Sequence, residues 1–253
     1  MAASPKQRLD ATLVERGLAA SRERARALIL AGQVRVDGQI VSKAGAPIAA
    51  TARAELVTPD HPYVSRGGVK LAHALETFGI DPSGRHALDI GASTGGFTDV
   101  LLGRGAATVV ALDVGHGQLD WRLRTDPRVI VREGVNARHL TREDVPPPTD
   151  LVTIDVAFIS LDHIFPALGP LVRPGTVVVS LVKPQFEAGR DQVGKGGLVT
   201  DPAVHEAVLL KVTEAAARAG FERMGMVPAV ITGAKLLPGR EFLEAAEAIV
   251  ALA

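Results

Sequence analysis

The segment LDIGASTGGFTDV, residues 88–100, decides the fold. It opens as a buried strand, passes through a turn made by Gly91, Gly95 and Gly96, and starts a helix at Phe97. Small residues let a ligand approach the backbone, and the helix N-terminus offers unpaired N–H groups. The spacing is not G-x-G-x-x-G, so the dinucleotide fingerprint of dehydrogenases is absent. Glycine turns of this kind also occur in α/β folds without any ligand role.

Apolar runs and amphipathic stretches alternate on both sides of this segment. Near-continuous Val/Ile/Leu strands separated by helices indicate a mostly parallel sheet covered on both faces. Right-handed crossovers make this a doubly wound, Rossmann-like α/β fold, in which ligands bind at the carboxyl ends of the strands. The predicted strands are 86–92, 108–114, 128–134, 150–158, 176–184 and 224–231; the predicted helices are 68–79, 95–105, 161–171, 202–220 and 241–253.

Polar residues follow several of these strands. Asp113 ends the second strand, 22 residues after Gly91, where a carboxylate can accept hydrogen bonds from both ribose hydroxyls of a nucleoside. Asn136 follows the third strand and Asp155 follows the fourth. Each signal is weak alone, but together with the glycine turn they favour S-adenosylmethionine as the cofactor.

Lys183 ends the fifth strand, and Pro184 stops that strand at once. A lysine at the end of this largely apolar strand is expected to point into the cleft at the sheet edge. Lys70 and Glu241 could reach the same cleft. Lys70 could equally be an ordinary surface lysine, and Glu241 an acid favoured by a helix N-terminus.

The first 60 residues carry a net charge of +3 and the remainder −3, within a chain of 253 residues whose net charge is zero. RLDATLVERGL predicts a helix, Ser21 is a natural N-cap for a second helix, and Asp37-Gly38 indicates a hairpin. Arg22 and Arg26, four residues apart, share one helix face. The face either meets a polyanion or is simply solvated.

This pattern, over residues 8–41, resembles the S4-type RNA-binding domain. The resemblance implies a small N-terminal α+β domain that binds RNA phosphates. It places the phosphate contacts on Arg22, Arg24, Arg26, Arg35 and Lys43.

Residues 44–66 look like a linker with one short strand, AELV, and the boundary is expected near Pro59–Pro62. We therefore expect an RNA-binding domain with its linker over 1–60 and a second domain over 61–253. Tyr63 lies close to Arg66, a further candidate for RNA binding. The tyrosine could stack on a base or pack at an interdomain seam.

Five segments of the second domain, in order YVSRGGVKLAHAL, LDIGASTGGFTD, TIDVAFISL, LVKPQFE and REFL, resemble the TlyA branch of the FtsJ-type ribose 2′-O-methyltransferases. This resemblance implies a class I methyltransferase that uses S-adenosylmethionine to methylate a ribose 2′-hydroxyl of ribosomal RNA, on cytidine in 16S and/or 23S rRNA, with ribosomal RNA or subunits as partners. Some members carry haemolysin-like names. The implied catalytic tetrad is Lys70, Asp155, Lys183 and Glu241, and the implied cofactor site is Gly91, Ala92, Ser93, Gly95, Gly96, Phe97, Asp113, Asn136 and Asp155.

Two departures from the family accompany this match. A Gly-Asn pair usually stands close before the last glutamate, whereas this chain has Pro-Gly-Arg, so the position of Glu241 is less firmly defined. In the linker, His61-Pro62-Tyr63-Val64 replaces the Arg-x-Trp-Val of mycobacterial members, which puts any role of that linker in ordering the cofactor site in doubt.

Composition and motif spacing bear on whether the protein binds a metal, spans a membrane or binds a nucleotide. The chain has no cysteine and no His pair at metal-binding spacing, so no metal is expected. No leader-like apolar run or membrane-spanning run is present, which favours a soluble, cytoplasmic protein. Residues 189–195 fit G-x-x-x-x-G-K, but Gly196 replaces the Ser/Thr of a P-loop, so a basic loop bearing Lys195 over the RNA cleft, or a plain surface loop, is expected. The competing hypothesis is a non-catalytic RNA-binding or membrane-active protein.

Overall fold

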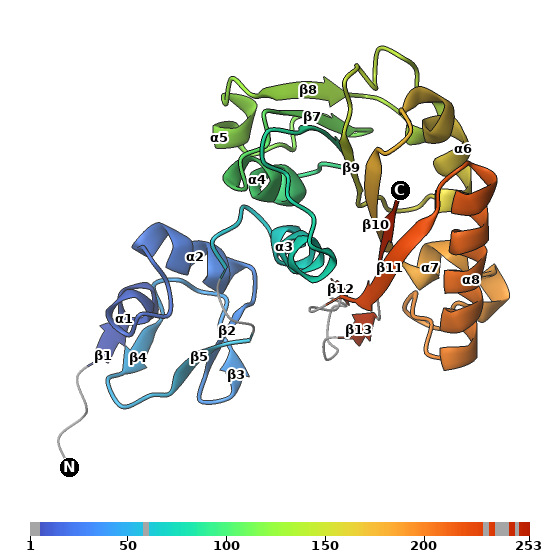
Figure 1. Cartoon of the computed structure of the whole chain (residues 1–253). Coiled ribbons are helices and arrows are strands. Elements are labelled where there is room, and N and C mark those ends of the chain that lie inside the picture. Colours follow the sequence, from blue (N-terminus) through green and yellow to red (C-terminus); the bar gives the residue numbers. More distant parts are fainter. Residues whose placement is uncertain (1–5, 58–60, 230–232, 236–242, 246–247) are drawn as a thin grey trace. The chain divides into compact units, whose positions relative to one another are not determined.

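The computed structural model describes residues 6–57, 61–229, 233–235, 243–245 and 248–253 (Figure 1). Contacts divide the chain into two compact units, Met1–Pro62 and Tyr63–Ala253. Each unit has its own apolar core, and the two are described separately.

The first unit contains two helices and two small sheets. The predicted cap is confirmed: the Ser21 hydroxyl accepts a hydrogen bond from the Arg24 N–H at 3.1 Å. The predicted hairpin is also confirmed, with Asp37 and Gly38 both at positive φ. The elements are β1 (Lys6–Arg8), α1 (Leu9–Glu15), α2 (Arg22–Leu30), β2 (Val34–Val36), β3 (Gln39–Ile40), β4 (Pro47–Ala49) and β5 (Ala54–Leu56).

The AELV segment, expected within the linker, is β5 and belongs to a sheet of order β3-β2-β5. Strands β1 and β4 form a second, antiparallel pair. Leu9, Leu13, Ile29 and Val34 are fully buried between these layers. The amphipathic spacing of the two helices therefore builds a core for this small unit.

The second unit is built on a seven-stranded sheet of order β11-β14-β10-β9-β6-β7-β8. Strands β8, β7, β6, β9 and β10 pair in parallel, whereas β14 runs antiparallel to both of its neighbours. The strands are β6 (His86–Ile90), β7 (Thr108–Asp113), β8 (Val129–Glu133), β9 (Leu151–Ile154), β10 (Val177–Val182), β11 (Arg223–Pro228) and β14 (Ala248–Leu252), with a separate pair β12 (Gly233–Lys235) and β13 (Leu243–Ala245).

Helices cover both faces of this sheet, as the apolar strands predict (Figure 1). Helices α3 (Gly67–Phe78) and α4 (Gly96–Gly103) pack on one face through residues such as Leu71 and Leu101. Helices α6 (Phe165–Leu168) and α8 (Pro202–Arg218) pack on the other through Phe165 and Val212. The remaining short helices are α5 (Trp121–Arg124), α7 (Pro184–Glu187), η1 (Ala137–His139), η2 (Leu161–His163), η3 (Gly169–Leu171) and η4 (Arg190–Gln192).

Two predicted helices are wrong in detail. Residues 161–171 split into η2, α6 and η3, because Pro166 and Pro170 interrupt a continuous helix. The predicted helix 241–253 instead contains β13 and β14. Its last residues, Val250, Ala251 and Leu252, are fully buried between β10 and β11, so pairing on both edges overrides the helix propensity of the Ala- and Glu-rich sequence.

Candidate active site

The site lies where the strand order reverses. Strands β6 and β9 are neighbours, but the chain leaves β6 toward β7 on one side and leaves β9 toward β10 on the other. A crevice therefore opens beyond their carboxyl ends. Two adjoining cavities, of about 290 and 400 Å³, occupy it and share the lining residues Gly91, Ser93, Asp155 and Ala157.

Gly91 allows the loop after β6 to approach the loop after β9 closely. Its φ is 85°, in the left-handed region, and a Cβ here would clash with the carbonyl oxygen of Asp155. The Asp155 N–H donates to the Ile90 carbonyl at 2.9 Å, which extends the β6–β9 pairing past the strands. Glycine is thus required for the close approach that carries Asp155 into both cavities.

The smaller cavity, which we call the lysine cavity, brings together three of the four predicted tetrad residues. Lys70 from α3, Asp155 after β9 and Lys183 after β10 all line it. The Lys183 Nζ and Asp155 Oδ1 atoms lie 2.5 Å apart, and Lys70 is only 8% exposed. The fourth residue, Glu241, lies outside the described residues.

Positive charge predominates among the described residues that line the lysine cavity. Arg66, Lys70 and Lys183 contribute positive charge, and Asp155 contributes the single carboxylate among these four. Partly buried charges interact more strongly than exposed ones because solvent screens them less. The cavity therefore favours an oxyanion or a phosphate, and it is suited to hold a hydroxyl group that develops negative charge.

A second carboxylate lies behind the site within the sheet. Asp89 is fully buried, and its two oxygens accept hydrogen bonds from Thr98 at 2.7 Å and Thr153 at 2.9 Å. Burial raises the pKa of Asp89 to about 6, and the charge of Asp155 adds to this, while the two hydroxyls oppose it. Through these two hydrogen bonds, Asp89 connects β6 with α4 and β9 beneath the crevice.

The larger cavity, which we call the acid cavity, contains the predicted ribose acceptor. Asp113 lines it, with its oxygens accepting from the Ser93 N–H at 2.8 Å and the Gly115 N–H at 2.7 Å. These two bonds fix the carboxylate and leave further lone pairs for a ligand. Asn136 lines the same cavity, and its side chain accepts from the Arg138 N–H at 3.1 Å. Apolar walls come from Ile90, Leu112, Val156 and Ile159.

Sequence reasoning did not select Phe158, which also lines the acid cavity. The residue is 87% exposed, its ring centroid lies 5.1 Å from that of Phe186, and its φ is 64°. A bulky residue in the left-handed region is strained. The sequence shows only an aromatic residue three positions after Asp155, and it does not show that the backbone turns this ring outward.

The glycine turn serves the two cavities unequally. Gly91, Ala92, Ser93, Gly96 and Phe97 line at least one of them. Gly95 is not among the described lining residues; its φ is 98°, and a Cβ would clash with Leu123. This glycine therefore closes the turn onto α5.

The segment before α3 forms the outer wall of the lysine cavity. Ser65, Arg66 and Gly67 line it, and the Val64 N–H donates to the Asp99 carboxylate of α4 at 2.8 Å. Tyr63 packs against the apolar cluster of α3 and α4. Arg66, predicted to bind RNA, thus lies in the same cavity as the lysines.

The other predicted RNA-binding residues lie on exposed or half-buried surface. Arg22, Arg24 and Arg26 belong to α2, Arg35 to β2, and Lys43 to the loop before β4. In the second unit, Lys195 is exposed in the turn that a bridge between Gly194 and Leu198 closes, shortly after η4. Residues 189–195 thus form a 3-10 turn and a loop after β10, rather than a P-loop after the first strand.

Comparison with known proteins agrees with this geometry. The family model described as FtsJ-like methyltransferase matches residues 63–235, and the S4 domain model matches residues 7–51. Among solved structures, a hemolysin-named protein from Streptococcus thermophilus is 41% identical, with a TM-score of 0.74, and the match covers 99% of this chain and 89% of that chain. The fold and the site thus define a methyltransferase of the FtsJ type with an N-terminal S4 domain.

Curated relatives narrow this class. The 16S/23S rRNA (cytidine-2′-O)-methyltransferase TlyA of Mycobacterium tuberculosis is 49% identical over 227 residues, which cover 89% of this chain and 85% of the relative. Hemolysin A of Brachyspira hyodysenteriae is 40% identical, with 90% and 95% covered. The chain belongs to the TlyA family of FtsJ-like methyltransferases. None of the described helices combines the length and the apolar composition that a transmembrane span requires.

Proposed function

We propose that this protein transfers a methyl group from S-adenosylmethionine to a ribose 2′-hydroxyl of ribosomal RNA. The observation that carries the proposal is the Lys183–Asp155 ion pair beside the buried Lys70, in a cavity that adjoins a second one of nucleoside size. The RNA substrate, cytidine in 16S and/or 23S rRNA, follows the name of the M. tuberculosis relative. On this proposal the protein acts in the cytoplasm, on ribosomal subunits.

The acid cavity has the features that the adenosine part of the cofactor requires. A cavity of about 400 Å³ falls within the range of small-ligand sites. Asp113 can accept hydrogen bonds from both ribose hydroxyls while its backbone donors hold it in place. Asn136 offers a polar side chain, and the apolar walls suit a purine ring. Gly91 and Ser93 line both cavities, so this turn would hold the part of the cofactor that carries the methyl group.

The lysine cavity has the features that the hydroxyl requires. The bound cofactor supplies an activated methyl group, so the difficulty lies in the weakly nucleophilic alcohol. Lys183 would act as the neutral amine, having given up its proton before the reaction: it would orient the 2′-hydroxyl and accept its proton at Nζ. The cofactor would supply the methyl group and leave as the thioether. Asp155 then stabilises the resulting ammonium at 2.5 Å. Lys70 and Arg66 stabilise negative charge on the oxygen or on the neighbouring phosphate.

The direct test is to map ribose methylation on rRNA from cells with and without the protein. A 2′-O-methylated nucleotide that disappears with the protein, and returns with the wild type but not with Lys183→Ala, supports the proposal. Identical methylation maps would contradict it.

A binding experiment separates the enzyme from the alternative, a non-catalytic RNA-binding or membrane-active protein. Calorimetry of the whole chain with S-adenosylmethionine, with and without ribosomal subunits, should give saturable binding. The absence of any binding heat under both conditions would favour the non-catalytic alternative.

A further inference from the structure

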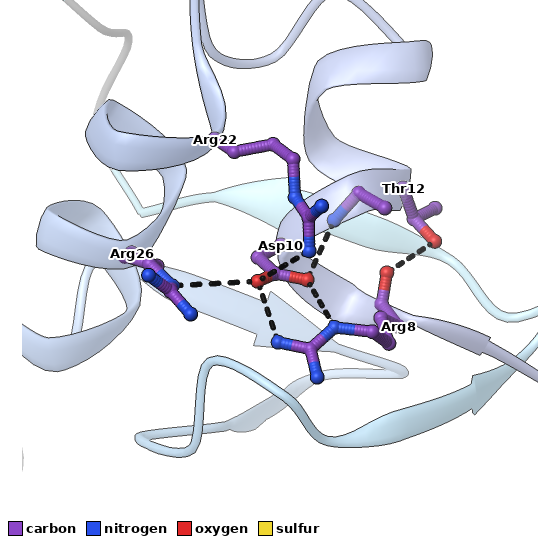
Figure 2. Close-up of polar contacts among 6 residues, drawn as sticks. Arg8, Asp10, Thr12, Arg22 and Arg26 are labelled. Atoms are coloured by element: carbon purple, nitrogen blue, oxygen red, sulfur yellow. Dashed lines mark hydrogen bonds and ion pairs between the residues drawn. The ribbon is translucent and has the colours of Figure 1, made fainter.

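One buried carboxylate in the first unit gathers three arginines. Asp10, in the first turn of α1, has a fully buried side chain. Figure 2 shows the side chains of Arg8, Arg22 and Arg26 pointing toward it. Arg8 donates to it through Nε at 3.0 Å and Nη2 at 2.8 Å, in a two-pronged arrangement. Arg22 Nη2 lies 3.3 Å from Oδ2, and Arg26 Nε lies 3.5 Å from the same atom. The cluster therefore joins β1, α1 and α2.

The exposure of the four side chains is sharply unequal. The arginine side chains are 51%, 59% and 60% exposed, for Arg8, Arg22 and Arg26, whereas that of Asp10 is 0% exposed. A molecule approaching from solvent thus meets guanidinium groups and not the carboxylate. The hydrogen bonds from Arg8 hold the pKa of Asp10 well below its usual range, so the carboxylate remains charged at physiological pH.

The arginines keep donors for an additional partner. A guanidinium has five N–H groups, and Arg8 spends two of them on Asp10. The Arg8 head also lies against Gly45, where a Cβ would come within 3.2 Å of both terminal nitrogens. This contact and the two-pronged bond fix the plane of the guanidinium. Planar, fixed guanidinium groups suit the geometry of phosphate oxygens, and prior ordering lowers the entropy lost on binding.

We propose that Asp10 is a positioning residue for RNA binding, which holds Arg8, Arg22 and Arg26 as a pre-formed clamp for a backbone phosphate. The proposal rests on the proposed function in rRNA methylation. The carboxylate lowers the net charge of this surface by one unit, yet we assign it a favourable effect on affinity. Simple electrostatics and positioning therefore predict opposite results when the charge of Asp10 is removed.

The test uses the full chain with Asp10→Asn, which preserves size but removes the charge and the second acceptor for the arginine fork. The probe is ribosomal subunits from cells that lack the protein, and the dissociation constant is measured at several salt concentrations. We expect affinity to fall at least about 5-fold. The slope of log affinity against log salt concentration should become less negative by about 1, since a phosphate contact is lost. Unchanged or tighter binding would overturn the proposal.

Glu23→Gln is the matched control. It makes the same change in net charge at an exposed residue of α2. We expect affinity to stay equal to the wild type or to rise slightly. If Glu23→Gln weakens binding as much as Asp10→Asn does, the effect is not specific to the cluster and the proposal is wrong.

A second variant covers the case in which Asp10→Asn fails to fold. Arg8→Lys keeps the positive charge next to Asp10 but cannot make the two-pronged bond. We expect weaker binding to subunits with an unchanged far-ultraviolet circular dichroism spectrum. Wild-type affinity and salt dependence for Arg8→Lys would overturn the proposal.

Methylation assays separate this inference from the proposed function. If Asp10→Asn binds subunits more weakly but the wild type does not methylate rRNA, the proposed function is contradicted and the clamp is not. Methylation by the wild type with binding that is insensitive to Asp10 and Arg8 would contradict the clamp alone.

Discussion

Lys183 and Asp155 follow neighbouring parallel strands, β10 and β9, and their Nζ and Oδ1 atoms lie 2.5 Å apart. The register of the two strands places one ammonium and one carboxylate at the same edge of the sheet. Pro184 ends β10 immediately after Lys183 and starts α7, so the side chain leaves the sheet at the crevice. The pair is therefore fixed by strand pairing and does not depend on a flexible loop.

Lys183→Ala should lower the rate of methyl transfer by at least about 100-fold, the usual size of a lost proton-transfer group. The affinity for S-adenosylmethionine should remain within a few-fold, because the acid cavity is untouched and Asp155 stays. Single-turnover methylation of ribosomal subunits and calorimetry measure the two effects. A wild-type rate in the alanine variant would remove Lys183 from the reaction.

Asp113→Asn should weaken cofactor binding and spare the chemical step. The amide has one oxygen acceptor in place of two, while Ser93 and Gly115 both donate to this side chain. We expect the KM for S-adenosylmethionine to rise at least about tenfold, as for the loss of one charge-assisted hydrogen bond, and kcat at saturation to change little. Equal losses in kcat and in kcat/KM, with an unchanged KM, would contradict this role.

Gly91→Ala should destabilise the protein by about 2–4 kcal/mol, since it combines a left-handed φ with a clash against the Asp155 carbonyl. It should also abolish methylation by displacing Asp155. Gly103→Ala is the control: a Cβ at Gly103, at the exposed end of α4, meets nothing within 4 Å. That variant should retain activity and unfold no more easily than the wild type. Chemical denaturation with activity assays measures both; equal stability of the two variants would contradict the argument.

Phe158→Ala should impair the use of RNA more than the binding of the cofactor. The exposed ring at the rim of the acid cavity offers a flat face on which a base can stack. Loss of one stacked base costs about 1–3 kcal/mol, so kcat/KM for ribosomal subunits should fall about 5- to 100-fold. Phe158→Tyr should keep most of the activity. If the alanine variant instead loses cofactor affinity by the larger factor, the ring contacts the cofactor and not the RNA.

Asp89 should make stability depend on pH. Its folded-state pKa of about 6 exceeds the ordinary value of 3.8, so the folded state binds the proton more tightly than the unfolded state does. The stabilising contribution is complete below pH 3.8 and is lost as pH rises through about 6. Asp89→Asn does not titrate, so the free energy of unfolding of the wild type relative to this variant should fall between about pH 4 and 6. Urea denaturation across this range measures the difference, and a flat difference would contradict the assignment.

The sequence predicts the elements whose pattern is local. Near-continuous apolar runs identified all five parallel strands, and Ser21 and Asp37-Gly38 located a helix start and a hairpin. It also pointed to Asp113, Asp155 and Lys183 as residues that follow strands, because topology alone brings strand ends together. The roles of these residues remain predictions until the variants above are measured.

The features missed by sequence reasoning depend on distant neighbours. The predicted helix 241–253 is rich in Ala and Glu, which favour a helix, and the pairing of Ala248–Leu252 with β10 and β11 decides the conformation of those residues. Asp10 looks like an ordinary helix-start acid until Arg22 and Arg26 fold over it. The outward direction of Phe158 depends on a backbone angle that no sequence pattern encodes.

The place of β14 between β10 and β11 has a consequence for synthesis of the chain. Until the ribosome has released Ala248–Leu252, β10 has one bare edge and β11 has no neighbour in the large sheet. Exposed strand edges recruit other chains, so the nascent protein is most prone to aggregation just before this strand inserts. Insertion of this strand buries both edges at once, and it extends the sheet beside the strand that leads into Lys183.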